Sequence, residues 1–281
     1  MKKSATFLIA VIATAGLFFG CNGKSSKADN SLSELKGRGV FVLGLDDSFP
    51  PLGFRDENNE ITGYDIDLAK EVSKRLGVTF KAQPINWDAK EQELSTGNID
   101  CIWNGLTITE ERKAILSFTK PYLNNAQIVV VRNDSGINSL ADLKGKKIGL
   151  QAGSSAQDAV DANPDFKDSL ADIIPFEQNL LALTDLSIGG VDGVVMDIVV
   201  AEYSIKTAWL PFHTLSESLA SEEYGIAFRK NDSKLTNEVQ SILEQMAADG
   251  TVAAISKKWF GNDISVIGRS ENFSVLTLIL Y

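Results

Sequence analysis

The chain has 281 residues, of which 44% are hydrophobic and 23% charged, a composition typical of a globular protein with one large domain or two of ordinary size. Its formal net charge is −10 and no basic patch is visible, which argues against a nucleic-acid partner and requires any site for an anion to be local. With one His and two Cys in the chain, neither a metal site nor a bound cofactor is expected.

Residues 1–20 are typical of a signal peptide, because a charged start precedes an apolar run, 7–19, that is too short to span a membrane. Cys21 follows as in bacterial lipoprotein signals, in which this cysteine becomes the lipidated N-terminus, although Phe18 stands where the usual pattern has Leu. We expect 21–36 to be a lipidated N-terminus with a polar tether, and the protein to be extracytoplasmic and anchored in the cell membrane. The alternative is a plain secretory signal. Loss of 1–20 would remove two lysines and no acid, giving −10 − 2 = −12.

Apolar runs alternate with segments of helical period in the first half of the chain. The loop 46–54 contains two prolines that force an extended path. The predicted strands are Val40–Leu45, Val78–Ala82 and Ile99–Trp103, and the predicted helices are Tyr64–Leu76 and Ala89–Thr96. This alternation predicts a largely parallel sheet that is covered by helices.

The same alternation continues in the second half. The predicted strands are Ile128–Val131, Lys147–Leu150, Val191–Met196 and Gly225–Phe228. The predicted helices are Leu140–Leu143, a helix from Ala156, Leu180–Ile188, Leu235–Ala248 and Thr251–Trp259. The tail 265–281 fits no element and has no assigned role.

Polar residues follow four unrelated strands at the point where each strand ends. They are Asp46, the pair Gly105 and Thr107, Gln151 and Asp197. Ligands of open α/β sheets bind beyond the carboxyl ends of the strands, so these four positions predict one binding site.

A short helix follows the strand that ends near residue 103. Thr109 is predicted to be its N-cap, with Glu110 and Glu111 in the first turn. Arg112 comes three residues after the cap and can turn back over the helix start, where hydroxyls, backbone N–H groups and the guanidinium would suit a carboxylate. The alternative is an ordinary capped helix with a solvated arginine.

Five motifs in register resemble the polar amino-acid binding proteins of bacterial ABC importers. They are GYDIDLA (63–69), GLTITEER (105–112), SFTKPY (117–122), YGIA (224–227) and KWFG (258–261). The resemblance covers about 37–264. It implies an α/β, two-lobed periplasmic-binding-protein-like fold of type II, with a ligand cleft between the lobes and two crossover strands.

By this resemblance the chain crosses twice between its lobes. Lobe one would comprise 37–121 plus 225–264, and lobe two 127–219, with crossings near 122–126 and 220–224. Members of the family close around the ligand by a hinge motion.

The resemblance also implies which residues bind the two charged groups of an α-amino acid. Arg112 would clamp the α-carboxylate, with the hydroxyl of Thr107 beside it, while the carbonyl of Gly105 and the acid of Asp197 would face the α-ammonium. Ser155 would donate to the carboxylate across the closed cleft. Read alone, Asp197 is better explained as the cap of the helix that follows it, and the resemblance reverses this.

Further positions would surround the ligand side chain. Phe49 and Trp87 would form aromatic walls, Asp46 would lie near the side-chain end, and Gln151 takes a place that varies in the family. The alternatives are core residues for the two aromatics and a solvated turn for Asp46. Asp65 is predicted to be structural, as the cap of its helix.

The leading hypothesis is a lipid-anchored, monomeric receptor that delivers a free amino acid, polar or basic rather than acidic, to the membrane subunits of an ABC permease. One alternative is a dehydratase-like enzyme on the same fold, but the only His, His213, does not match the site. Another is an amino-acid sensor domain, which needs a spanning helix and an output domain that this sequence does not predict.

Overall fold

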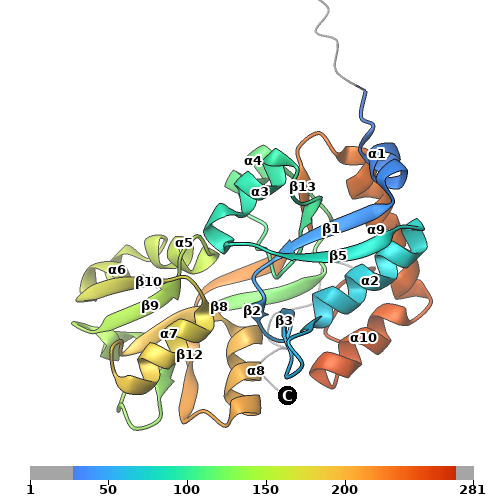
Figure 1. Cartoon of the computed structure of the whole chain (residues 1–281). Coiled ribbons are helices and arrows are strands. Elements are labelled where there is room, and N and C mark those ends of the chain that lie inside the picture. Colours follow the sequence, from blue (N-terminus) through green and yellow to red (C-terminus); the bar gives the residue numbers. More distant parts are fainter. Residues whose placement is uncertain (1–27, 270–281) are drawn as a thin grey trace, which may run out of the picture.

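The computed structural model describes residues 28–269 and contains two five-stranded sheets, each at the centre of one lobe (Figure 1). The predicted signal peptide, Cys21 and the tail beyond residue 269 lie outside the described residues. Within 28–269, no helix has both the length and the apolar character needed to cross a membrane.

The first sheet is made of β1 (Val40–Leu45), β5 (Thr79–Pro84), β6 (Cys101–Ile102), β7 (Leu116–Phe118) and β13 (Ala227–Arg229). Its order is β5-β1-β6-β13-β7, with β1 parallel to β5 and β6, and β13 antiparallel to β6 and β7. A small antiparallel sheet, β2 (Ser48–Phe49), β3 (Gly53–Arg55) and β4 (Ile61–Thr62), lies in and after the segment predicted to be a loop.

The second sheet is made of β8 (Leu123–Arg132), β9 (Lys147–Gln151), β10 (Asp172–Phe176), β11 (Gly193–Asp197) and β12 (Phe212–Tyr224). Its order is β10-β9-β11-β8-β12, with β9 parallel to β10 and β11, and β8 antiparallel to β11 and β12. Both sheets are therefore mixed. The prediction of largely parallel pairing holds for β1, β5 and β6 in the first sheet and for β9, β10 and β11 in the second. It is wrong for β7 and β13 in the first sheet and for β8 and β12 in the second, because these strands pair antiparallel with each other.

Helices cover the sheets from both sides, as Figure 1 shows for α5 and α7 of the second lobe. The first lobe carries α1 (Ser31–Arg38), α2 (Tyr64–Leu76), the 3₁₀ turn η1 (Trp87–Ala89), α3 (Lys90–Thr96), α4 (Glu110–Ile115), α9 (Ser233–Ala248) and α10 (Thr251–Phe260). The second lobe carries η2 (Leu140–Leu143), α5 (Ser155–Asp161), α6 (Pro164–Ser169), α7 (Asn179–Ile188) and α8 (Ile198–Ala208).

Helix α2 shows how the sequence sets these elements. Its apolar residues recur at helical spacing, and Ile66, Leu68 and Val72 are fully buried. The helix ends at Gly77, whose φ of 75° is a left-handed conformation that glycine adopts without steric cost. The predicted bounds of α2 are confirmed.

Two paired strands join the lobes. The first residues of β8 pair with the last residues of β12, with Leu123 opposite Tyr224, Asn125 opposite Glu222 and Gln127 opposite Ala220. The resemblance implies two crossover strands here, and both long strands continue through these segments. One end of each strand reaches the first lobe (Figure 1).

Aromatic side chains fill the core beside this junction. The Tyr122 ring lies 6.3 Å from the Trp103 ring and 6.2 Å from the Tyr224 ring, between centroids, and all three residues are fully buried. Ser265, from the tail with no assigned role, is buried against the Tyr122 carbonyl.

Candidate functional site: a cleft between the two lobes

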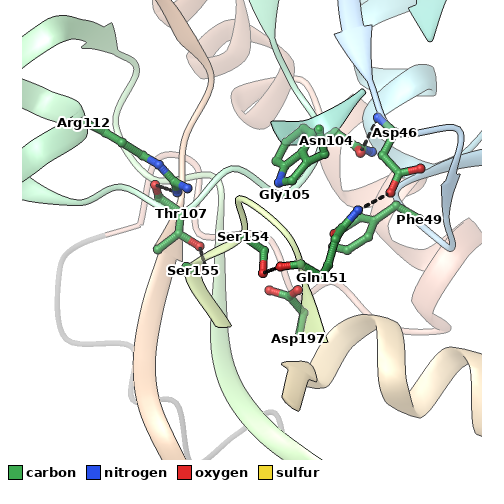
Figure 2. A pocket seen from close by; sticks show the side chains of 11 residues that line it. Asp46, Phe49, Asn104, Gly105, Thr107, Arg112, Gln151, Ser154, Ser155 and Asp197 are labelled. Carbon is green, nitrogen blue, oxygen red and sulfur yellow. Dashed lines mark hydrogen bonds between the residues drawn. The ribbon is translucent and has the colours of Figure 1, made fainter. Parts of the chain in front are cut away.

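The cleft lies where loops at the carboxyl ends of the strands of both lobes meet. The residues that line it are Asp46, Phe49, Trp87, Asn104, Gly105, Thr107, Arg112, Gln151, Ser154, Ser155 and Asp197 (Figure 2). All nine residues that the sequence predicts for the site are among them. The cavity that remains between them measures about 10 Å³, roughly the space of one water molecule. The lobes are therefore closed, and any larger molecule must displace them to enter.

The short helix α4 aims Arg112 into one side of the cleft. As predicted, Thr109 caps this helix, accepting from the Arg112 backbone N–H at 3.1 Å. The Arg112 guanidinium turns back and donates to the Thr107 carbonyl oxygen at 2.8 Å. Of the carboxylates in residues 28–269, none lies within 4.0 Å of Arg112. The guanidinium therefore has donors available for an incoming anion.

Hydroxyl groups from the two lobes meet beside this arginine. The Thr107 and Ser155 hydroxyl oxygens are 3.0 Å apart, and both residues are buried. Thr107 comes from the loop after β6, and Ser155 is the first residue of α5. Their contact bridges the lobes.

Asp197 lies at the carboxyl end of β11 and is buried. Its Oδ1 accepts from Asn125 Nδ2 at 2.6 Å, from Gln127 Nε2 at 2.9 Å and from the Tyr224 hydroxyl at 2.5 Å. Burial, and next the negative charge of Glu222, raise the pKa of Asp197 to about 7. The residue stands at the N-cap position of α8 but its side chain makes no capping hydrogen bond, so the alternative reading as a helix cap is wrong.

Three polar residues beside Asp197 were not predicted from the sequence. Asn125 and Gln127 are fully buried on β8, and the half-buried Glu222 on β12 accepts from both of their amide nitrogens. An Asn and a Gln two residues apart in a strand face the same side, and this spacing is a signal that could have been read.

Asp46 follows β1 on the side of the cleft away from Arg112 (Figure 2). Its carboxylate accepts from the Ser48 backbone N–H and hydroxyl at 2.9 and 2.7 Å, and from Gln151 Nε2, in the other lobe, at 2.7 Å. Burial raises the pKa of Asp46 above its ordinary value. With an exposure of 4%, Asp46 is not the solvated turn of the alternative reading.

Two aromatic rings close the remaining sides, and one lysine lies beside them. Phe49 and Trp87 are buried and also belong to the hydrophobic cores, so they serve as both wall and core. Lys90 Nζ lies 5.3 Å from the Trp87 ring centroid and donates to the Gly153 carbonyl oxygen, in the second lobe, at 2.8 Å. Burial lowers the pKa of Lys90. Its side chain resembles a solvated helix residue in sequence, which is why it was missed.

Gly105 has a left-handed φ of 61°, and a Cβ here would lie 2.9 Å from Phe49 Cε1. Its N–H donates to Asp65 Oδ2 at 3.1 Å, and the Tyr122 hydroxyl donates to the same oxygen at 2.9 Å. The prediction that Asp65 caps α2 is therefore wrong, because Gly63 holds the cap position and Asp65 supports the cleft from behind.

No three His, Cys, Asp or Glu side chains within residues 28–269 gather in a way that could hold a metal ion. His213 lies outside the cleft, with its ring nitrogens 3.0 Å from Asn133 Oδ1 and 3.2 Å from the Ile137 carbonyl oxygen. The residues that line the cleft thus offer one cation, Arg112, and two acids, Asp46 and Asp197, in a nearly closed space, an arrangement suited to holding a small molecule with charges of both signs.

Known proteins resemble the chain over most of its length. It is 30% identical over 260 residues to the L-cystine-binding protein TcyJ of Escherichia coli (strain K12), covering 92% of this chain and 96% of that protein. An ABC uptake transporter substrate binding protein from Streptococcus pneumoniae with bound histidine has a TM-score of 0.82 at 34% identity, with 85% of this chain and 98% of that one covered. An ancestral arginine-binding protein bound to arginine has a TM-score of 0.74 at 41% identity, with 80% and 99% covered.

These likenesses confirm the predicted α/β two-lobed fold of the type II periplasmic binding proteins. All three proteins are described as binding proteins and none of them as an enzyme, so the dehydratase-like alternative gains no support. The family model for bacterial extracellular solute-binding proteins, family 3, matches residues 41–262. The chain belongs to this family.

Proposed function

We propose that the protein binds a free L-amino acid in the cleft and delivers it to the membrane subunits of an ABC permease. The α-carboxylate binds Arg112 and Thr107, with Ser155 donating from the other lobe, and the α-ammonium binds Asp197 and the Gly105 carbonyl. One observation carries this proposal: within residues 28–269, a guanidinium without a carboxylate partner and a buried carboxylate without a cation partner line the same closed cleft. A zwitterion matches both groups.

The charges around the cleft favour a basic ligand. Lys90 is paired with Glu91 at 3.3 Å. The charged residues that line the cleft are then Arg112 and two acids, Asp46 and Asp197, and Glu222 adds a third carboxylate behind Asp197. A zwitterion adds no net charge, whereas a cationic side chain offsets part of this excess. The aromatic walls Phe49 and Trp87 suit a cation. The relatives described above bind cystine, histidine and arginine, which are polar or basic.

Delivery depends on closure and on attachment to the membrane. Closure brings lobe one, 37–121 plus 225–264, against lobe two, 127–219. The Thr107–Ser155 and Asp46–Gln151 hydrogen bonds are contacts of this kind between the lobes. Residues 31–36 of the expected tether belong to α1, so the tether is shorter than the sequence predicts. Lipidation of Cys21 with this shorter tether holds the protein at the outer face of the membrane as a monomer. Changing Cys21→Ser would move the protein from the membrane fraction to the soluble extracytoplasmic fraction, and retention in the membrane would contradict the anchor.

A thermal-shift screen of the purified protein over the twenty amino acids plus cystine, followed by calorimetry, tests ligand binding. A ligand present at a hundred times its Kd stabilises the folded state by about 2.7 kcal/mol. We expect arginine, lysine, histidine, cystine or glutamine among the positive results, and aspartate and glutamate among the negative ones. A screen without any stabilising amino acid would overturn the proposal.

A further inference from the structure

The strand register places two acids and two amides on one face of the second sheet. Asp197 on β11 is directly opposite Gln127 on β8, and Asn125 on β8 is directly opposite Glu222 on β12. Directly opposite residues of antiparallel strands project to the same face, and so do residues two apart on one strand. The four side chains therefore form one cluster, which we call the acid–amide cluster. Its members all lie on the second sheet.

The two carboxylates of the acid–amide cluster share their donors. Asn125 Nδ2 donates to Asp197 Oδ1 at 2.6 Å and to Glu222 Oε2 at 2.8 Å. Gln127 Nε2 donates to the same two oxygens at 2.9 and 3.0 Å. Two carboxylate oxygens that contact the same two nitrogens are close neighbours, and like charges this close resist being ionised together.

Two buried acceptors in the cluster lack hydrogen-bond partners. Asn125 Oδ1 and Gln127 Oε1 are enclosed and accept no hydrogen bond from the residues that the structure describes. No Lys, Arg or His nitrogen of the described residues lies within 4.0 Å of the Asp197 or Glu222 carboxylates. A buried acceptor without a donor is costly, so the cluster as it stands is incomplete. Two acids and two free amide oxygens together suit an ammonium group, which carries three donors.

We propose that Glu222 is a positioning residue of the ammonium-binding site, and that Glu222 and Asp197 act as one carboxyl pair that gives up a proton when the ligand ammonium binds. Glu222 does not line the cavity, and acts through Asp197 and the shared amides. Without a ligand the pair holds one proton on a carboxyl oxygen. The arriving ammonium replaces it, and the proton leaves to the solvent. This inference rests on the proposed amino-acid function.

Among residues 28–269, the other groups that contact Asp197 and Glu222 are uncharged, so Glu222 is the neighbouring charge that affects the pKa of Asp197. Tyr224 donates its hydroxyl to Asp197, and the pKa of Tyr224 is raised well above its ordinary value, so the tyrosine stays neutral across the range of interest. Thr107, whose hydroxyl donates to Glu222 at 3.1 Å, is uncharged, and Arg112 reaches only the Thr107 carbonyl. Burial together with Glu222 raises the pKa of Asp197 to about 7.

The sign of the resulting pH dependence follows from linkage. A group that is protonated in the free protein and ionised in the complex makes binding release a proton, so affinity increases with pH until the group is already ionised. We expect the affinity to rise by up to about tenfold per pH unit between pH 5.5 and 7 and to level off above that range. The α-ammonium of the ligand keeps its proton throughout.

The test compares the wild type with Glu222→Gln by calorimetry from pH 5.5 to 8, with L-arginine, L-glutamine and L-cystine as probes. Buffers of different ionisation enthalpy count the protons released. L-glutamine has no side-chain cation, so its profile reports the α-ammonium end rather than Asp46. The matched control is Glu223→Gln, which removes the same charge from the neighbouring exposed residue on the opposite face of β12.

We expect Glu222→Gln to shift the midpoint of the pH profile down by about one unit and to reduce the proton release at pH 7, with the Glu223→Gln profile like that of the wild type. A Glu222→Gln profile that superimposes on the wild type, or an equal loss of affinity at every pH, would overturn the inference while leaving amino-acid binding intact. Absence of wild-type binding to all three probes would overturn the proposed function as well. Thermal unfolding of each variant checks folding.

Discussion

Gly153 in the second lobe packs against Asp88 in the first so closely that a Cβ atom at Gly153 would lie 2.7 Å from Asp88 Oδ1 and 2.9 Å from Asp88 Cα. The Gly153 carbonyl also accepts a hydrogen bond from Lys90 of the first lobe. These contacts exist only while the lobes are closed. Glycine at this position therefore permits full closure over the cleft.

Gly153→Ala should weaken ligand binding by about tenfold or more, because an overpacked contact costs about 1–3 kcal/mol. The ligand-induced decrease in radius of gyration, measured by small-angle X-ray scattering, should also become smaller. Gly136→Ala is the control, because the two glycines have similar φ values, 71° at Gly136 and 68° at Gly153. A Cβ atom at Gly136 would meet no other atom within 4 Å. Equal affinities of the two variants would mean that backbone strain, and not the contact between the lobes, sets the effect.

Arg112→Ala should reduce the affinity for the bound amino acid by about 2–5 kcal/mol, because it leaves the ligand carboxylate buried without its charge partner. Isothermal titration calorimetry measures this loss directly. Lys113→Ala is the control, because Lys113 is the next residue of α4 and its ammonium pairs with the exposed Glu110. Unchanged binding by Arg112→Ala would reject the assignment of the carboxylate site.

Asp46→Asn should lower the affinity for L-arginine relative to L-glutamine by about tenfold, because the lost charge lies at the side-chain end of the cleft. Any disturbance of the hydrogen bonds from Ser48 and Gln151 affects both ligands, so the ratio of the two affinities is the quantity to measure. In the control, Asp47→Asn, the lost carboxylate belongs to a surface pair with Arg55. An unchanged ratio would show that Asp46 does not select the side chain.

Asp65→Asn should make the stability of the folded protein decrease less as the pH rises. Burial raises the pKa of Asp65 to about 8 in the folded state, from 3.8 in the unfolded chain. Between these values the folded protein holds a proton that the unfolded chain has lost, so unfolding releases a proton and is favoured as pH rises. The stability difference between the variant and the wild type should shift toward the variant by up to about 1.4 kcal/mol per pH unit.

Urea unfolding from pH 5 to 8 measures this difference. Asp67→Asn provides the control, because Asp67 lies on the same helix but accepts from Lys258 Nζ at 2.6 Å and from Trp259 Nε1 at 2.8 Å near the surface. A constant difference between Asp65→Asn and the wild type across the range would contradict the raised pKa.

The sequence predicts best those elements whose side chains alternate or recur on one buried face. The apolar runs of β1, β9 and β11 and the helical period of α2 and α9 are of this kind. Strand β12 was missed because its sequence, FHTLSESLASEEY, is largely polar and lies at the edge of the sheet, where one side meets water. Strand β10 lies at the other edge and contains a proline.

The residues of the cleft also divide into those that the sequence predicts and those that it does not. Residues at strand ends, such as Asp46 and Asp197, could be found because polar groups that interrupt apolar runs stand out. The residues that hold Asp197 lie in the segments between the lobes, where Asn, Gln and Glu look like those of any linker. Only the pairing of β8 with β12 brings Glu222 beside Asn125, and pairing between strands about a hundred residues apart leaves no local trace.

The pairing of β8 and β12 through the junction also bears on how the molecule moves. Residues 123–127 and 220–224 satisfy each other's backbone groups as a two-stranded ribbon. Such a ribbon flexes across its flat face without exposing amides to water, but sliding one strand past the other would break its ladder. The two lobes should therefore rotate about one hinge axis and return to the same relative orientation each time they close. A protein that recognises the closed form would then encounter one defined arrangement of the lobes.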